Sequence, residues 1–286
     1  MPWGAWTPTK LRHSVRVLDS SMNTVEVETD SGRGYLKALG NREGEHALAC
    51  ELIGSSLAEW LGLATLDFTL VEVPTDMILY LDADETSPLA TRRRAKPGPA
   101  FLSKAIPAVA WDGTPDDLAR LDNPGAIAGL VVLDTWIGNP DRHPRRPPDT
   151  TISRWTKQNL DNVLLEILPR NRRRIVAMDF TVCLHCREGG LRSSYPGSLV
   201  RDDGIYGLFS EFEPLVTTAS LRPFLDRLQD RGLAQHVGEA VARIPSEWQV
   251  DERTRDAVSG FLSARAAYLV DNLLTNHRRT VQCGPT

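Results

Sequence analysis

A lysine and a glutamate occupy positions at which they could form a buried ion pair. Lys37 lies in the apolar run 35–39, in a chain that has only five lysines against 28 arginines. An ammonium that is buried without a partner is costly, so Lys37 requires a nearby anion. Glu51 follows 14 residues later, on a predicted helix over residues 45–61 whose same face carries small residues. Such a face can approach a sheet closely, which predicts a Lys37–Glu51 contact. The simpler alternatives are a lysine whose amine reaches solvent and an ordinary helix glutamate.

Three further polar residues are candidates for proton transfer and metal binding. Asp141 lies in the loop Gly138-Asn139-Pro140-Asp141-Arg142-His143, directly after an apolar helix, which suits a general base. Asn162 precedes the first strand of a predicted hairpin, and Asp179 follows its second strand. These two ends of an antiparallel hairpin lie side by side, about 4.8 Å apart, and their oxygens suit Mg²⁺. The alternatives are a helix-ending Asn-Pro turn and a hairpin whose polar ends face water.

Short strands and helices must position these residues. In the N-terminal part, alternating polar and apolar residues predict strands over 14–18, 24–29, 35–39, 68–73 and 77–81. Together with the helix over 45–61, they predict a five-stranded antiparallel sheet with one helix on it. Residues 82–99 have the composition of a linker. The expected C-terminal elements are an apolar helix over 125–136, hairpin strands over 163–168 and 173–178, and long helices over 221–242 and 253–276.

Taken together, these segments resemble a protein-kinase-like fold, and more narrowly the HipA-like Ser/Thr kinases. The matching segments are the loop 138–143 and Tyr35-Leu36-Lys37-Ala38-Leu39-Gly40-Asn41, Glu51-Leu52-Ile53, Leu61-Gly62-Leu63, Asn162-Val163-Leu164-Leu165 and Met178-Asp179-Phe180. The Asn-x-Asp-Arg-His form is also similar to that of the lipid-kinase branch. The resemblance implies a bilobal α+β fold, with a small antiparallel β-sheet lobe over residues 1–98. Residues 99–286 would form a larger, mostly helical lobe that carries the catalytic loop and the metal-binding hairpin.

The same resemblance implies phosphoryl transfer that depends on ATP and Mg²⁺, with a protein Ser/Thr hydroxyl as the acceptor. Lys37 would hold the α- and β-phosphates of ATP and pair with Glu51, and Asp141 would orient and deprotonate the attacking hydroxyl. The residues implied for cofactor binding are Lys37, Ser20, Ser21, Asn162 and Asp179, of which Asn162 and Asp179 would bind the metal. The implied partners are ATP and a protein substrate, with a regulatory or antitoxin-like protein as a further option.

The sequence departs from the family pattern at three places. The loop that contains Ser20 and Ser21 has no glycine. Eighteen residues separate His143 from Asn162, which predicts either a surface insertion over residues 144–158 or Asn159 in place of Asn162 as the metal ligand. Thr181 follows the Asp-Phe pair where a glycine is common.

A second group of side chains has metal-ligand spacing. Cys183-Leu184-His185-Cys186 is a Cys-x-x-Cys segment that could hold Zn²⁺ or form a redox pair. Cys50 and Cys283 are far away in the sequence, and a structural zinc site normally needs four ligands. Thiols without a metal, on a segment after the metal-binding aspartate, are the favoured interpretation.

Composition excludes several other classes of protein. The net charge of −4 and the pI of about 5.9 disfavour nucleic acid as a partner. The arginine runs at 92–94, 145–146 and 170–174 are interpreted as solvated surfaces. The N-terminus has no apolar stretch typical of a signal peptide, and the longest apolar run, near 126–133, is too short to span a membrane. We therefore expect a cytoplasmic protein without a membrane partner.

Three alternatives to a protein kinase remain open at this point. A small-molecule or lipid kinase would use the same groups as a protein kinase. A pseudokinase would bind nucleotide and regulate a partner, which the long insertion and the glycine-free loop favour and the five retained polar residues oppose. Nucleotidyl transfer to protein would use a similar cleft.

Overall fold

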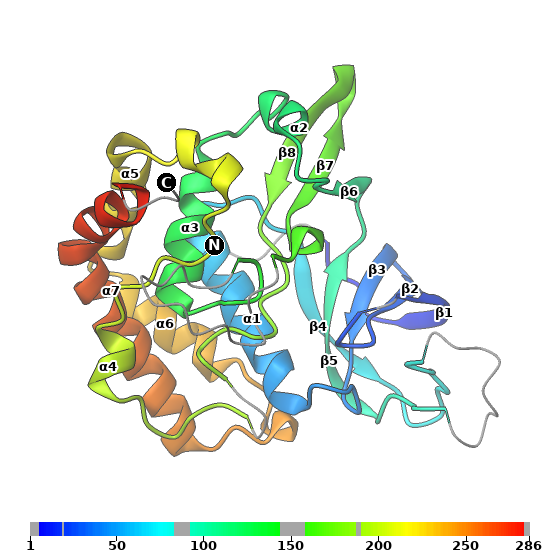
Figure 1. Cartoon of the computed structure of the whole chain (residues 1–286). Coiled ribbons are helices and arrows are strands. Elements are labelled where there is room, and N and C mark those ends of the chain that lie inside the picture. The colour runs from blue at the N-terminus through cyan, green and yellow to red at the C-terminus, as the bar shows by residue number, and fades with distance from the viewer. Residues whose placement is uncertain (1–5, 19, 83–91, 144–157, 187–189, 283–286) are drawn as a thin grey trace.

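The computed structural model describes residues 6–18, 20–82, 92–143, 158–186 and 190–282. A β-rich lobe and a mostly helical lobe lie on either side of helix α1 (Glu45–Trp60), as Figure 1 shows. The predicted insertion at 144–158 lies outside the described residues except for its last residue. Residues 83–91 of the predicted linker over 82–99 also lie outside the described residues.

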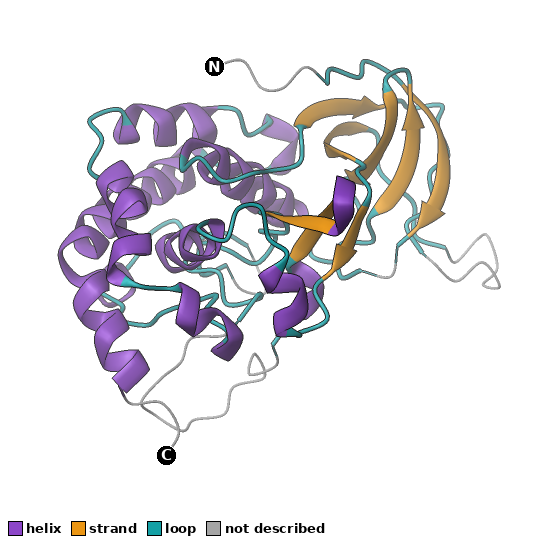
Figure 2. Ribbon diagram, turned by 90° about the horizontal axis from the view of Figure 1, so that it is seen from above, coloured by secondary structure: helices purple, strands orange, loops and turns teal. Residues whose placement is uncertain are grey.

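An antiparallel sheet with the strand order β1-β2-β3-β5-β4 forms the first lobe (Figure 2). Its strands are β1 (Leu11–Val17), β2 (Val25–Thr29), β3 (Gly32–Lys37), β4 (Phe68–Val73) and β5 (Gly98–Lys104). Side chains alternate along β3, so Leu36 packs with Val25 and Val27 in an apolar core on one face. Tyr35 and Lys37 point to the opposite face and line a cavity. The alternation of β3 therefore places the lysine at the site.

The predicted five-stranded antiparallel sheet is confirmed, but its fifth strand was misplaced. Residues 77–81 lie outside the sheet, where Tyr80 forms an isolated bridge with Arg94. The fifth strand is β5, which pairs with β3 only from Phe101 to Lys104. Pro99 precedes that stretch, so its missing N–H removes no bond to β3. The sheet thus extends to Lys104, past residue 98, where the sequence placed the end of the small lobe.

Helix α1 is buried over nearly its whole length. All residues from Ala47 to Ala58 are buried, including Glu51. The helix begins after Gly44, which has a positive φ of 94° and whose N–H binds the Asn41 side chain. Because α1 contacts β5 on one side and helices of the second lobe on the other, its residues can reach groups from both lobes.

The second lobe combines helices with a three-stranded sheet in the order β6-β7-β8. Its strands are β6 (Ala108–Ala110), β7 (Leu164–Leu168) and β8 (Arg172–Val176). Its helices are α2 (Pro115–Ala119), α3 (Ala126–Ile137), α4 (Gly197–Val200), α5 (Thr218–Leu228), α6 (Leu233–Ala242) and α7 (Glu252–Gln282). Short 3₁₀ turns cover Leu160–Asn162, Pro169–Asn171, Ser210–Leu215 and Ser246–Trp248.

One predicted helix is wrong in its extent. The helix expected over 221–242 is divided into α5 and α6. The Asp230 carboxylate accepts the backbone N–H of Gly232 at 2.7 Å, and this local bond competes with a continuing helix. The last helix, α7, is longer than predicted at both ends. Among the described residues, no helix has the length and apolarity needed to cross a membrane.

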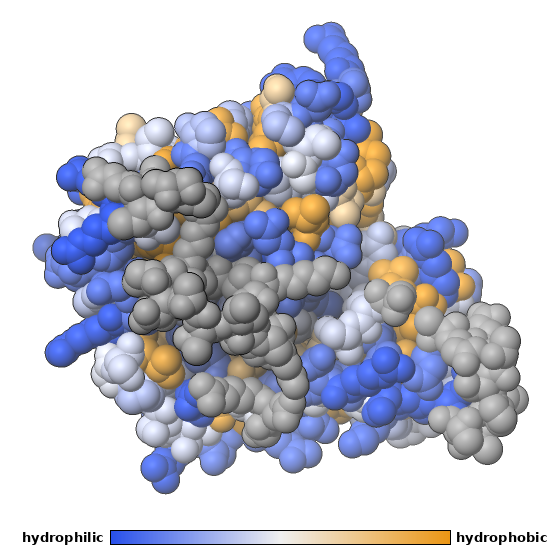
Figure 3. Space-filling view, in the orientation of Figure 1, coloured by the Kyte–Doolittle hydropathy of each residue, from blue (hydrophilic) through white to orange (hydrophobic). Residues whose placement is uncertain are grey.

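The arginine run in the β7–β8 hairpin lies on a hydrophilic projection. Figures 1 and 3 show this hairpin extending from the top of the molecule, with hydrophilic residues at its tip. Arg172 pairs with Asp122, Arg173 lies 3.6 Å from Asp117, and Arg174 lies 2.6 Å from Glu166. Acidic neighbours therefore balance three of these arginines.

Candidate active site

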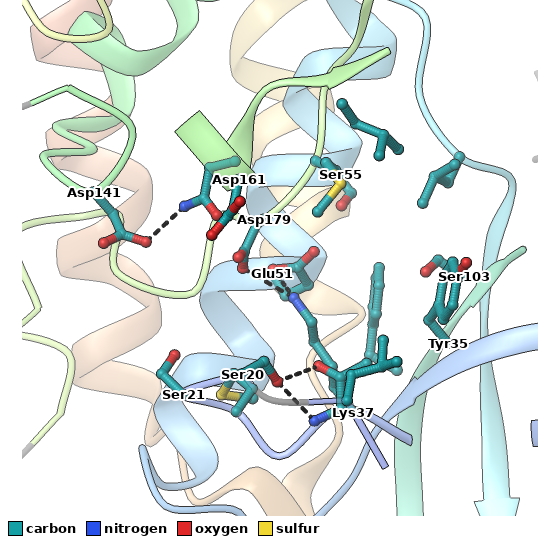
Figure 4. Close-up of a pocket in the computed structure, with 18 of the residues that line it drawn as sticks. Ser20, Ser21, Tyr35, Lys37, Glu51, Ser55, Ser103, Asp141, Asp161 and Asp179 are labelled. Atoms are coloured by element: carbon teal, nitrogen blue, oxygen red, sulfur yellow. Dashed lines mark hydrogen bonds and ion pairs between the residues drawn. The ribbon is translucent and has the colours of Figure 1, made fainter. Parts of the chain in front are cut away.

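Lys37 lies between two carboxylates from different parts of the chain. Its Nζ atom is 3.0 Å from Glu51 Oε2 on α1 and 3.0 Å from Asp179 Oδ1, which follows β8. Figure 4 shows the three side chains converging on one point. The predicted Lys37–Glu51 contact is therefore present, and Asp179 joins it.

The charges of this cluster are set by competition between burial and pairing. Burial alone would lower the pKa of Lys37, but Asp179 and Glu51 raise it above its usual value. Burial alone would raise the pKa of Asp179, but Lys37 holds it below the ordinary range. Burial raises the pKa of Glu51, and the attraction of Lys37 opposes that rise. At neutral pH, Lys37 is thus protonated and Asp179 ionised.

Glu51 also fixes the segment that carries Asp179. The backbone N–H of Phe180 donates a hydrogen bond to Glu51 Oε2 at 2.9 Å. Gly54, one turn further along α1, faces Phe180 so closely that a Cβ atom there would lie 2.3 Å from Phe180 Cβ. The small face of α1 therefore approaches the segment after β8, as well as bringing Glu51 to Lys37.

The backbone around Asp179 explains why threonine is tolerated at position 181. Asp179 has the left-handed φ of 59°, whereas Thr181 is not among the residues with positive φ. The Thr181 hydroxyl donates to Asp179 Oδ1 at 3.3 Å. Position 181 therefore does not require glycine, and its side chain helps to orient the aspartate.

Asp141 and Asn162 form a second pair on the wall of the same cavity. The Asn162 amide donates to Asp141 Oδ2 at 2.8 Å. Burial raises the pKa of Asp141, and the charge of Asp179 raises it further, while the Asn162 bond lowers it. Asp141 is therefore a better proton acceptor than a solvated aspartate.

A buried ion pair beneath Asp141 was missed by the sequence analysis. Arg142 Nε lies 2.9 Å from Asp134 Oδ2, and both side chains have 0% exposure. Asp134 Oδ1 also accepts the Asn139 amide, while Arg142 donates to the carbonyl of Met178 at 2.9 Å. The network thereby joins the loop of Asp141 to the residue before Asp179. Its signal in the sequence is that Asp134 is the only acidic residue of the apolar helix α3.

All the sequence-predicted site residues line one cavity of about 490 Å³. They are Ser20, Ser21, Lys37, Glu51, Asp141, Asn159, Asn162 and Asp179. The cavity wall also contains residues that were not predicted as site residues, namely Tyr35, Ser55, Phe68, Phe101, Ser103, Asp161 and Met178. Asn159 and Asn162 both reach the cavity.

The glycine-free loop between β1 and β2 borders this cavity. The Ser20 hydroxyl accepts the backbone N–H of Thr24 at 2.9 Å and donates to the Thr24 hydroxyl at 3.1 Å. Asn23 adopts a left-handed φ of 54°, a conformation that asparagine tolerates. Side-chain bonds and an asparagine thus shape this turn without a glycine. Ser21 is exposed at the cavity edge.

Comparisons with known proteins agree with this arrangement. The family model of the HipA-like kinases matches residues 28–148. The crystal structure of the Helicobacter pylori proinflammatory kinase CtkA is similar with a TM-score of 0.55 at 11% identity, covering 96% of this chain and 98% of that one. The Golgi casein kinase structure is similar with a TM-score of 0.54 at 9% identity, covering 96% of this chain and 75% of that one. A comparison with curated protein sequences finds no match.

The lobes and strand order, together with these comparisons, define a protein-kinase-like fold. More narrowly, residues 28–148 are similar to the HipA-like kinases, whose family model they match. The resemblance stated from the sequence is therefore confirmed at the level of the fold.

Proposed function

We propose that this protein transfers the γ-phosphate of ATP, with Mg²⁺, to a hydroxyl group, and that the acceptor is a serine or threonine of a protein. The observation that supports the proposal best is the position of Lys37. Its ammonium is held between Glu51 and Asp179 at the wall of a cavity that also contains Asp141 and Asn162. Phosphoryl transfer needs this combination of a fixed cation, a base and metal ligands.

In this proposal, Lys37 binds the α- and β-phosphates. Its raised pKa keeps the ammonium charged, and Glu51 fixes its position through the 3.0 Å contact. Because the cation is already oriented, little reorganisation is needed when charge moves onto the phosphates. Ser20 and Ser21, at the cavity edge, would cover the phosphates from the first lobe.

Asp141 is assigned to the acceptor hydroxyl. Its Oδ2 atom receives the Asn162 amide, so the carboxylate is held in one orientation. The other oxygen can accept the hydroxyl proton as the oxygen attacks phosphorus. The raised pKa of Asp141 favours that transfer.

The donor groups next to Asp141 fit Mg²⁺. Asn162 uses its amide nitrogen toward Asp141, which leaves its carbonyl oxygen as a ligand. Asp179 uses Oδ1 toward Lys37 and Thr181, which leaves Oδ2. One amide and one carboxylate oxygen, completed by phosphate and water, are the ligands that Mg²⁺ prefers. When bound, Mg²⁺ would neutralise phosphate charge.

Labelled ATP distinguishes this proposal from its rivals. The protein is incubated with Mg²⁺ and a cell extract, once with γ-labelled and once with α-labelled ATP. Protein labelling from the γ-position alone supports a protein kinase. Label from the γ-position in small molecules or lipids, and not in protein, would show that the acceptor hydroxyl belongs to a small molecule or a lipid. Labelling from the α-position indicates nucleotidyl transfer, and ATP binding without any labelled product indicates a pseudokinase.

A further inference from the structure

The cavity has a charged half and an uncharged half. The groups that the proposed function assigns to the phosphates, the acceptor and Mg²⁺ form the charged half, around Lys37, Asp141 and Asp179. The remaining wall is mainly apolar and aromatic, and includes Leu18, Tyr35, Phe68, Phe101, Leu164 and Met178. A wall of this kind suits the flat, uncharged base of a nucleotide.

Ser103 is a small residue between two aromatic side chains of the uncharged half. It is paired directly with Tyr35 on β3 and with Phe68 on β4, so the three side chains form a row across the cavity face of the sheet. Neighbouring strands lie about 4.8 Å apart, which separates the two aromatic residues by about 10 Å. The Phe68 ring packs against that of Phe101, two residues before Ser103, with ring centroids 5.4 Å apart. Because a serine side chain is short, the row has a gap at Ser103 that opens into the cavity.

The cavity also reaches helix α1. Its wall contains Ser55 on α1 and Leu66, which precedes β4. Figure 4 shows Ser55 on the helix side of the cavity and Ser103 on the sheet side. We call the space between Ser103, Phe101, Leu66 and Ser55 the inner compartment. The gap at Ser103 therefore connects the place that suits a base with a compartment that extends to α1.

Two buried hydroxyls face the inner compartment. Ser55 and Ser103 are only 6% and 9% exposed, yet neither hydroxyl has a hydrogen-bond partner among the residues that the structure describes. By contrast, the hydroxyl of the adjacent Ser56 donates to the Leu52 carbonyl at 2.7 Å. Leaving a buried hydroxyl unpaired costs free energy, so such groups normally bond to protein, water or a ligand. Ser55 and Ser103 are thus available to a group that enters the compartment.

We propose that the nucleotide site accepts ATP whose 6-amino group carries an aromatic substituent, and that Ser103 is the residue that admits this substituent into the inner compartment. The inference rests on the proposed use of ATP. The triphosphate is held at Lys37, and the ribose is joined to N9, at the opposite end of the purine from the 6-amino group. On β5, Ser103 lies two residues beyond Phe101, the partner of Lys37. A base in the uncharged half therefore directs its 6-amino group away from Lys37 and toward Ser103.

The substituent leaves the chemistry of the transfer unchanged. The bond between the γ-phosphorus and its bridging oxygen breaks, the acceptor hydroxyl loses its proton to Asp141, and the second product is an ADP that carries the substituent. The aromatic group gains affinity by burying apolar surface against Phe101 and Leu66. A longer side chain at position 103 would fill the gap and exclude the group, while unsubstituted adenine does not need that space.

Calorimetric binding in the presence of Mg²⁺ tests this inference, with N⁶-benzyl-ATP as the probe. The unchanged protein should bind N⁶-benzyl-ATP with an affinity within about tenfold of that for ATP. γ-Labelled N⁶-benzyl-ATP should label the same products as γ-labelled ATP. Ser103→Met should lower the ratio of the affinity for N⁶-benzyl-ATP to that for ATP about tenfold or more, because methionine fills the gap. Ser103→Ala keeps the space and should keep the ratio.

Ser14→Met is the matched control, because Ser14 is exposed on β1 of the same sheet and lies outside the cavity wall. Its affinity ratio should equal that of the unchanged protein. If Ser103→Met fails to fold, Ser55→Leu narrows the compartment from α1 and should lower the same ratio. The inference is overturned if the unchanged protein binds or uses ATP but not N⁶-benzyl-ATP, or if Ser103→Met and Ser14→Met give the same ratio. Absence of ATP binding would instead overturn the proposed function, and this inference with it.

Discussion

The ammonium of Lys37 and the carboxylate of Glu51 lie 3.0 Å apart, with side chains only 11% and 5% exposed. A buried pair of this kind is strongly destabilised when one partner is removed, because the other charge is left without compensation. Here Asp179 is a second anion next to Lys37. Loss of Glu51 therefore leaves Lys37 paired, whereas loss of Lys37 leaves two carboxylates together.

Variants of this pair should reveal its coupling. Lys37→Met should lower ATP turnover about 100-fold or more, because the phosphate contact is lost. Lys37→Arg should not restore it, since a planar guanidinium does not fit the place of a compact ammonium. Glu51→Gln should cost less, and its effect should not add fully to that of Lys37→Met. Turnover of both single variants and the double variant measures the coupling, and losses that multiply as for independent sites would contradict it.

Asp179→Asn should abolish phosphoryl transfer while leaving the thermal midpoint within a few degrees. The amide removes the negative charge, yet asparagine tolerates the left-handed backbone at this position. Asp179→Ala, which strains that backbone, is the comparison that separates charge from conformation. Activity assays measure phosphoryl transfer, and thermal unfolding measures the midpoint. Activity near that of the unchanged protein in Asp179→Asn would exclude Asp179 as a metal ligand.

Gly54→Ala tests the close approach of α1 to Phe180. A Cβ atom at position 54 would lie 2.3 Å from Phe180, so the variant should lose about 1–3 kcal/mol of unfolding free energy. ATP affinity should fall too, because Phe180 adjoins Asp179. Gly260→Ala on α7 is the matched control, since nothing lies within 4 Å of its added atom. It should gain up to about 1 kcal/mol. Equal effects of the two variants in denaturant unfolding would refute the packing argument.

The pH dependence of kcat/KM should report the protonation of Asp141. The base acts when ionised, and burial together with Asp179 raises its pKa, so activity should decline on acidification at a higher pH than for a free aspartate. The Asn162 bond lowers that pKa. Asn162→Ala should therefore move the acid limb to still higher pH, in addition to reducing the rate. An acid limb that stays in place or moves to lower pH would argue against Asp141 as the base.

Asp134→Ala should destabilise the fold by about 3–5 kcal/mol, because it leaves the fully buried Arg142 guanidinium without its anion. The double variant Asp134→Leu/Arg142→Met should recover part of this loss, since no uncompensated charge remains. It should stay inactive, because Arg142 no longer holds the Met178 carbonyl. Denaturant unfolding measures both variants. A cost of less than about 1 kcal/mol for Asp134→Ala would show that the pair contributes little.

The sequence by itself determined the local chemistry of the site. Lys37 stands out because burying an ammonium is costly, and the hairpin geometry alone places Asn162 near Asp179. Strand β4, helix α1 and the apolar helix α3 were predicted within about two residues, because their periodicity is strong. Strand β5 was missed because its start, with Pro99, has the composition of a linker.

The tertiary structure decided which distant residues meet. Helix α1 is buried on all sides, so its own periodicity does not show which face meets β3, which faces Phe180 and which carries Cys50 to the turn at Cys183. The pairing of Asp134 with Arg142 likewise depends on a loop that folds back onto α3. Contacts of this kind arise when two lobes pack against one helix, and their energies depend on distances across the fold that spacing along the chain does not specify.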